Sequence, residues 1–172
     1  AFGYSFATWR LHLRGESIRS AQDVGWMRDL TVGRLMRTDV PKAPFDMTIA
    51  RFMEEFPARS TSQWAALVGP SGGYAGMAFV PDVHLAGLRA DAGATGLGEL
   101  ARSPEAFLLP EMNIRLAAHF FEQTEIEALA VVDNENERNV IGLLTEAHVL
   151  RRYSDELDKA RRELSGDWSD AS

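Results

Sequence analysis

The stretch that decides the fold is residues 128–148, which read ALAVVDNENERNVIGLLTEAH. Two short apolar runs, 128–132 and 140–144, flank a cluster of turn-forming residues, and a helix-compatible stretch follows at once from Glu146. This pattern predicts a β-hairpin that leads into a helix. Residues 65–82, AALVGPSGGYAGMAFVPD, repeat the pattern with Gly-Pro-Ser-Gly-Gly as the turn and a helix starting near Pro81.

The repeat extends upstream of both hairpins. A shift of 65 residues places 32–38, VGRLMRT, on 97–103, LGELARS. The same shift aligns two apolar faces at i, i+3, i+4 and i+7, which predict helices over Ile49–Phe56 and Ile114–Phe121. Candidate caps precede both helices: Asp46 or Thr48 in the first copy, and Glu111 or Asn113 in the second.

Each copy therefore reads β-α-β-β-α, and the fold class is α+β. Copies of ~50 to 60 residues are each small for independent stability, so we expect them to share one core. The expected organisation is a leading linker at 1–29, a first domain at 30–89, a small-residue linker at 90–95, a second domain at 96–153, and a helical extension and tail at 154–172.

Composition excludes several classes of function. The chain has 172 residues, a net charge of −7 and no cysteine, which argues against nucleic acid as a partner and against thiol chemistry or thiolate zinc sites. Gly69–Gly73 lacks the Gly-Lys-Ser/Thr of a phosphate loop, no histidine pair has metal-ligand spacing, and no Gly-x-Ser-x-Gly elbow is present. We expect no enzyme, no catalytic residues and no metal ligands.

The strand-to-helix junction of each copy is the candidate site. A glycine-led strand that ends in a hydroxyl, with an acid three residues later, can hold the two hydroxyl groups of a ribose, and a nearby helix N-terminus favours phosphate. The second copy offers Thr145 with His148, and the first offers Asp82 with Phe79. Neither copy has both groups, and helix capping is the alternative role for Thr145 and Asp82.

With these residues in view, the unit repeated over roughly residues 30 to 153 resembles a tandem pair of cystathionine-β-synthase-type (CBS) domains, a Bateman module. The leading segment Phe6–Glu16, FATWRLHLRGE, continuing to Asp23–Trp26, resembles the stretch after the last membrane helix of bacterial chloride-channel-family proteins. An amphipathic helix with a solvated arginine face is the other interpretation of this segment.

The resemblance implies a regulatory module at the cytoplasmic face of the cell membrane, in a voltage-gated-type chloride channel or chloride/proton antiporter. It implies two units packed with pseudo-twofold symmetry, an N-terminal helical linker, homodimers formed through the CBS pairs, and a transmembrane channel domain in the same polypeptide. A ligand-free structural dimerisation module, and the regulatory pair of a different transporter or enzyme, are the alternatives.

The resemblance also implies ATP, ADP or AMP as a regulatory ligand in clefts between the units, in some family members and not in others. One cleft would involve Thr38, Ser62, Gln63, Thr145 and His148, and the other Phe79, Asp82, Ser103, Ile126 and Glu127. A neutral His148 cannot supply a carboxylate's acceptors. Phe79 either stacks on a base or fills the hole.

Overall fold

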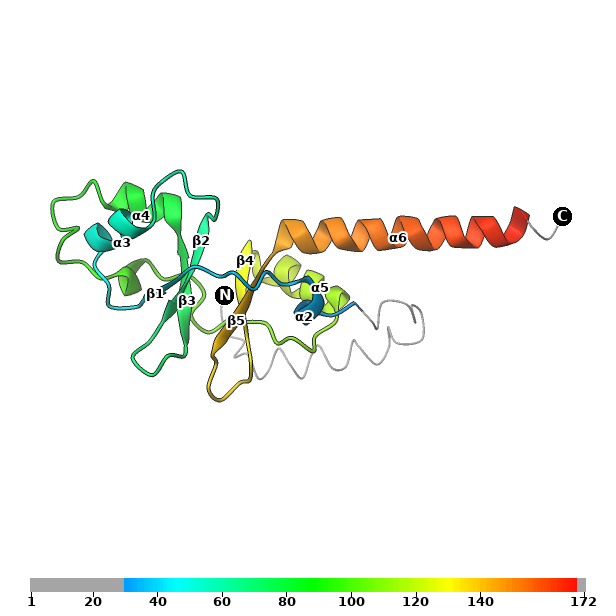
Figure 1. The fold of residues 1–172 in the computed structure, drawn as a ribbon, viewed down its shortest axis with the longest axis horizontal. Helices are drawn as coiled ribbons and strands as arrows, with labels where there is room; N and C mark the ends of the chain where they lie inside the picture. The colour runs from blue at the N-terminus through cyan, green and yellow to red at the C-terminus, as the bar shows by residue number, and fades with distance from the viewer. Residues whose placement is uncertain (1–29, 170–172) are drawn as a thin grey trace.

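The computed structural model describes the backbone of residues 30–169 and the side chains as far as Ser165 (Figure 1). The expected linker 1–29 and the segment that resembles the chloride-channel family lie outside the described residues. In chain order the elements are α2 (Val32–Leu35), β1 (Lys42–Pro44), α3 (Ile49–Glu55), β2 (Trp64–Val68), β3 (Tyr74–Phe79), α4 (Val80–Ala86), the 3-10 turn η2 (Leu97–Leu100), α5 (Ile114–Thr124), β4 (Ala128–Val132), β5 (Val140–Thr145) and α6 (Glu146–Ser169).

Two antiparallel hairpins, β2–β3 and β4–β5, form the centre of the two copies. Their registers match: Trp64 lies opposite Phe79 in the first copy, and Ala128 lies opposite Thr145 in the second. Both hairpins also shift register at the same point, between the last two residues of β2 and between the last two residues of β4. The predicted duplication is therefore present in backbone detail as well as in sequence.

The copies differ in their first strand. In the first copy β1 pairs in parallel with β2, which completes a three-stranded sheet. In the second copy the equivalent segment makes one parallel bridge. The Leu108 N–H donates to the Ala130 carbonyl at 2.9 Å, and the Leu108 carbonyl accepts from the Val132 N–H at 2.9 Å. Pro110 follows closely and has no N–H to extend the pairing.

The two predicted amphipathic helices are confirmed as α3 and α5, and the structure selects their caps. Thr48 Oγ1 accepts from the Arg51 N–H at 3.3 Å, and Asn113 Oδ1 accepts from the Leu116 N–H at 2.8 Å. Thr48 and Asn113, rather than Asp46 and Glu111, are therefore the N-caps. The first apolar residue after each cap, Ile49 or Ile114, is buried.

The leading segment of each copy packs on the other copy. The Val32 N–H donates to the Met112 carbonyl at 2.7 Å, and Arg37 exchanges two backbone hydrogen bonds of 2.9 Å with Leu143 on β5. In the reverse direction, Arg102 exchanges two backbone hydrogen bonds of 2.8 Å with Met77 on β3. This exchange ties the two copies together at both ends of their shared interface.

The core is divided by the β2–β3 hairpin. One face of this hairpin, with Ala66 and Met77, joins the core built around β4, β5 and α5, to which Val32 and Leu35 also belong. The other face, with Ala65, contributes to a smaller core under α3 and α4. Because alternate side chains of a strand point to opposite faces, one hairpin closes both cores. The predicted α+β fold of two copies around a shared core is confirmed.

Helix α6 begins at the end of β5, packs against α5 and then continues beyond the rest of the described chain (Figure 1). Among the described residues, no helix has both the length and the apolar character needed to cross a bilayer.

Candidate functional site

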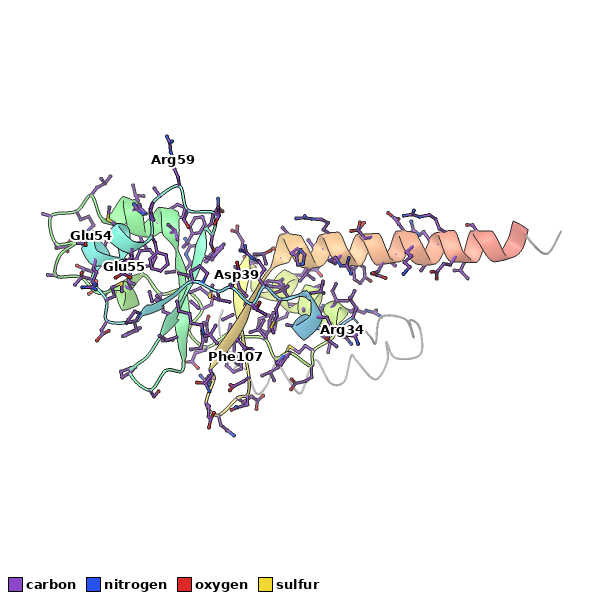
Figure 2. All side chains as sticks on the ribbon, viewed as in Figure 1. Arg34, Asp39, Glu54, Glu55, Arg59 and Phe107 are labelled. Carbon is purple, nitrogen blue, oxygen red and sulfur yellow. The ribbon has the colours of Figure 1, made fainter. Side chains whose placement is uncertain are left out.

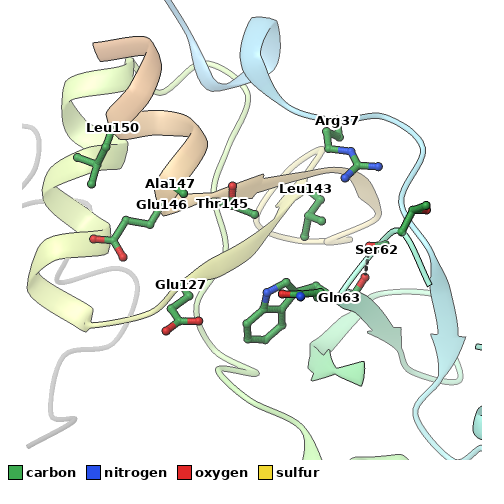
Figure 3. Close-up of a pocket in the computed structure, with 11 residues that line it drawn as sticks. Arg37, Ser62, Gln63, Glu127, Leu143, Thr145, Glu146, Ala147 and Leu150 are labelled. Carbon is green, nitrogen blue, oxygen red and sulfur yellow. Dashed lines mark hydrogen bonds between the residues drawn. The ribbon is translucent and has the colours of Figure 1, made fainter. Parts of the chain in front are cut away.

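A cleft of about 630 Å³ lies between the two copies, at the N-terminus of α6 (Figure 3). That volume is within the range of pockets that hold small molecules. It is lined by Arg37, Thr61, Ser62, Gln63, Trp64, Glu127, Leu143, Thr145, Glu146, Ala147 and Leu150. These residues come from the segment after α2, the approach to β2, the approach to β4, the end of β5 and the start of α6.

Backbone pairing positions the side chains of this cleft. The two backbone hydrogen bonds with Leu143 bring Arg37 to the end of β5, on the copy opposite to its own. The Glu146 N–H donates to the Glu127 carbonyl at 2.9 Å, which holds the approach to β4 beside the start of α6. Thr145 Oγ1 accepts from the His148 N–H at 3.3 Å, so Thr145 also caps α6.

The structure brings together part of the site expected from sequence. Ser62, Gln63 and Thr145 line the cleft. Thr38 follows Arg37 and His148 lies on the first turn of α6, but neither side chain is among the lining residues. Ser62 Oγ donates to the Trp64 carbonyl at 2.8 Å, so its hydroxyl already has a partner.

The residues expected to form the second cleft lie in different parts of the structure. Glu127 lines the cleft beside Arg37, although the sequence analysis grouped it with Asp82. Ile126 is partly buried and packs against the core built around β4, β5 and α5. The β4–β5 register explains this placement, because it puts the approach to β4 next to Thr145 in its own copy.

Arg37, Trp64 and Glu146 line the cleft and were not among the site residues expected from sequence. A signal for Arg37 was present, since the 65-residue shift superposes it on Arg102, and this arginine recurs in both copies. Trp64 and Glu146 have no counterpart of the same type in the repeat.

Among the described residues, the cleft carries one cationic and two anionic side chains, Arg37 against Glu127 and Glu146, which lie across the cleft from one another (Figure 3). Arg37 Nη2 lies 3.3 Å from Asp39 Oδ2, and this hydrogen bond lowers the pKa of Asp39. Both side chains are at least half exposed, at 50% and 78%, so the pair is solvated and costs little to break. The guanidinium of Arg37 is therefore available to an anionic ligand.

The equivalent junction of the first copy is occupied by side chains. The Arg102 guanidinium pairs with the Asp82 carboxylate and lies 5.3 Å from the Phe79 ring centre and 5.7 Å from that of Trp64. The two rings pack against each other with centres 4.7 Å apart. Phe79 therefore packs against both the Trp64 ring and the Arg102 guanidinium at this junction.

Ser103, the remaining residue expected at this junction, has a left-handed backbone with φ of 54°. Its carbonyl accepts from the Tyr74 hydroxyl at 2.8 Å, and burial raises the pKa of that hydroxyl. Ser103 is therefore held to the β2–β3 hairpin through its backbone. Among residues 30–169, no group of three or more histidine, aspartate or glutamate side chains could hold a metal ion.

The exchanged leading segments, the paired hairpins and the cleft at their junction define the fold of a tandem CBS-domain pair. The CBS domain family model matches residues 97–155, which cover the second copy. No curated protein matches the chain in sequence.

Solved structures extend the likeness to both copies. The CBS domain of a bacterial CNNM/CorC family Mg²⁺ transporter, in complex with ATP, aligns with a TM-score of 0.62 and 15% identity over 80% of this chain and 94% of that one. The cytosolic domain of the Mg²⁺ channel MgtE, in complex with ATP, gives 0.57 and 20% over 78% and 54%. The AMP complex of CBSX2 gives 0.57 and 20% over 73% and 97%. Likeness at these identities shows the fold alone.

Proposed function

We propose that this chain is the regulatory CBS pair of a membrane transporter and that it senses an adenine nucleotide in the cleft beside Arg37. The observation that carries the proposal is a cleft between two domains in which a guanidinium, a hydroxyl and an aromatic wall converge on one volume. Arg37 would bind phosphate, Thr145 would bind a ribose hydroxyl, and Trp64 would pack against the base.

The charges of the cleft indicate which nucleotide it favours. The N-terminus of α6 and Arg37 attract an anion, whereas Glu127 and Glu146 repel it. With two carboxylates against one guanidinium, a nucleotide with few negative charges is favoured over a free triphosphate. We therefore propose AMP as the preferred ligand, and expect ATP to bind mainly with a divalent cation that offsets its charge. The ATP and AMP complexes of the structural neighbours support the adenine part of this proposal.

Regulation would follow from the position of the cleft. Because its walls come from both copies, a ligand that fits one relative arrangement of the copies better than another shifts the population toward that arrangement. The shift equals the differential affinity of the ligand for the two arrangements. The exchanged segment 30–37 would pass the change toward the N-terminal side of the chain.

The host transporter is the finer part of the proposal. We propose a chloride channel or chloride/proton antiporter, with this module on the cytoplasmic face, because Phe6–Glu16, continuing to Asp23–Trp26, resembles the linker of that family. A divalent-cation transporter fits equally well with the structural neighbours. Liposomes containing the full-length host distinguish the two: chloride efflux that changes on adding AMP supports the first, and Mg²⁺ uptake without chloride flux supports the second.

Calorimetric titration of AMP, ADP and ATP, each with and without Mg²⁺, tests the nucleotide proposal directly. The proposal expects saturable heat with AMP and a rise in melting temperature, since a ligand that binds only the folded state stabilises it. Heat equal to that of dilution for every nucleotide, together with an unchanged melting temperature, would contradict it.

A ligand-free dimerisation module is the second candidate, and helix α6 favours it. Apolar residues recur on α6 at alternating intervals of three and four: Leu150, Tyr153, Leu157, Ala160 and Leu164. This is the a and d spacing of a coiled coil. Leu150 and Leu164 are 49% and 64% exposed, so both ends of the stripe are open to a second copy.

The charges beside this stripe select a parallel pairing. In this register Glu156 and Arg161 occupy g and e positions, which face each other across a parallel two-stranded coil. An antiparallel coil would instead bring Glu156 and Glu163 together. Sedimentation equilibrium tests this candidate: a dimer that Leu164→Asp dissociates, combined with no nucleotide binding, would favour it over the sensor.

A further inference from the structure

The two junctions of the repeat differ in composition at equivalent positions. The hairpin registers and the two exchanged bridges pair Arg37 with Arg102, Thr145 with Phe79, Ala128 with Trp64, and His148 with Asp82. At the Arg37 cleft the strand ends carry small or hydroxyl side chains. At the other junction the same two positions carry the rings of Phe79 and Trp64, which pack against each other with centres 4.7 Å apart. Trp64 also lines the Arg37 cleft.

We infer that the first-copy junction is closed by its own side chains, so that the chain takes one nucleotide, in the Arg37 cleft, rather than two. This inference rests on the proposed function for the identity of the ligand. The closure itself rests on the contacts of Phe79, Trp64, Asp82 and Arg102.

The arginine is the central part of the closure. Its guanidinium lies over both rings, at 5.3 and 5.7 Å from their centres, where the ring faces attract a cation. It also pairs with Asp82, the carboxylate that could otherwise accept from the ribose hydroxyls. At this junction, one side chain therefore lies over both rings and neutralises the acid that could otherwise bind a sugar.

The comparison with Arg37 shows what changes between an open and a closed junction. Arg37 pairs with Asp39, two residues along the chain, in a contact exposed to solvent. At its own junction the position equivalent to Asp82 is His148, which does not offer a carboxylate. The cation of the open cleft is therefore not held across the junction, whereas Arg102 is held by an acid and two rings.

The test counts binding sites by calorimetric titration of AMP into the wild-type chain and three groups of variants. Phe79→Thr places a hydroxyl near Asp82 and removes the Phe79 ring that the Arg102 guanidinium contacts. The double variant Phe79→Thr/Arg102→Ala also removes the guanidinium. Arg37→Ala and Asp82→Asn report where the wild-type site lies. Arg102→Ala alone, which leaves both rings in place, separates the contribution of the guanidinium from that of the rings. Circular dichroism melting verifies that each variant is folded.

The inference expects one site in the wild-type chain, weakened by about tenfold or more in Arg37→Ala and retained at wild-type affinity in Asp82→Asn and Arg102→Ala. It expects one additional site in Phe79→Thr or in the double variant. Two wild-type sites, a site weakened by Asp82→Asn but not by Arg37→Ala, or folded Phe79→Thr variants that gain no site would each overturn it. No binding by the wild-type chain would instead contradict the proposed function, and the gain of a site in the variants would still decide the inference.

Discussion

Arg37 and Arg102 hold equivalent places in the two copies, but Arg37 pairs with its near neighbour Asp39 whereas Arg102 reaches across its junction to Asp82. The backbone of each arginine is bonded to the second hairpin strand of the opposite copy, so the two start from the same geometry. The difference arises from their surroundings: two aromatic rings and an acid in one case, a threonine and a histidine in the other.

Replacing Arg37 with alanine is expected to weaken AMP binding by about tenfold or more, because a hydrogen bond to a charged group contributes about 1.5–3 kcal/mol. Calorimetry on the purified chain measures the effect. Arg34→Ala is the matched control, since Arg34 is exposed on α2 and is absent from the cleft lining (Figure 2). Equal affinities for the two variants would remove Arg37 from the site.

His148→Asp is expected to tighten AMP binding by about tenfold, because it places a carboxylate three residues after Thr145, where it can accept from a ribose hydroxyl. The gain should be smaller for ATP, whose phosphates meet the added negative charge. Ala147→Asp adds the same charge one position earlier and is expected to weaken binding. A loss of affinity in His148→Asp equal to that in Ala147→Asp would show that charge alone matters.

Gly76→Ala is expected to destabilise the fold by about 2 kcal/mol, because Gly76 has φ of +133°, a region that costs other residues about 1–3 kcal/mol. A Cβ there would also lie 2.9 Å from the Ala101 Cβ and 3.3 Å from the Arg102 carbonyl oxygen. Gly142 is its counterpart, but an added Cβ there meets the Met36 side chain, which can move. Urea unfolding should therefore give a smaller loss, about 1 kcal/mol, for Gly142→Ala.

Val32→Ala is expected to cost about 2 kcal/mol, since Val32 belongs to the first copy but is fully buried in the core built around β4, β5 and α5. Arg34→Ala, on the same helix but exposed to solvent, should change stability by less than about 0.5 kcal/mol. Thermal unfolding followed by circular dichroism measures both. A loss for Val32→Ala no larger than that for Arg34→Ala would contradict the observed exchange of leading segments.

Stability is expected to fall in acid as the β4–β5 turn loses its cap. The side-chain hydrogen bond from Asn139, 2.9 Å long, is the main cause that lowers the pKa of Asp133 below 3.8, the ordinary value for an aspartate. Because the folded-state pKa is depressed, this contribution is present above about pH 3.8 and is lost as the pH falls through the folded-state value. The difference in melting temperature between wild type and Asp133→Asn should shrink over that window, and Asn139→Ala should reduce this pH dependence.

The repeat and its apolar periodicity were sufficient to predict the two hairpins, the amphipathic helices and the shared core. The exchange of leading segments could not be predicted, because the bridges of Arg37 and Arg102 involve single residues that leave no periodic pattern. Ser62, Gln63 and Thr145 line the cleft, and their role in binding a nucleotide stays a prediction. The role of Arg102 could not be predicted from the sequence. Its pairing with Asp82 depends on two rings that come together only when β2 and β3 pair.

Helix α6 connects the cleft to a point far from it along the chain. Its first residue, Glu146, lines the cleft, and the helix continues without a break for 24 residues to Ser169. At 1.5 Å per residue that helix is about 36 Å long, so a tilt of about 10° at its base would carry the far end through about 6 Å. Binding of a mononucleotide at the N-terminus of α6 would thus displace the C-terminal end of the helix, which the ligand does not contact.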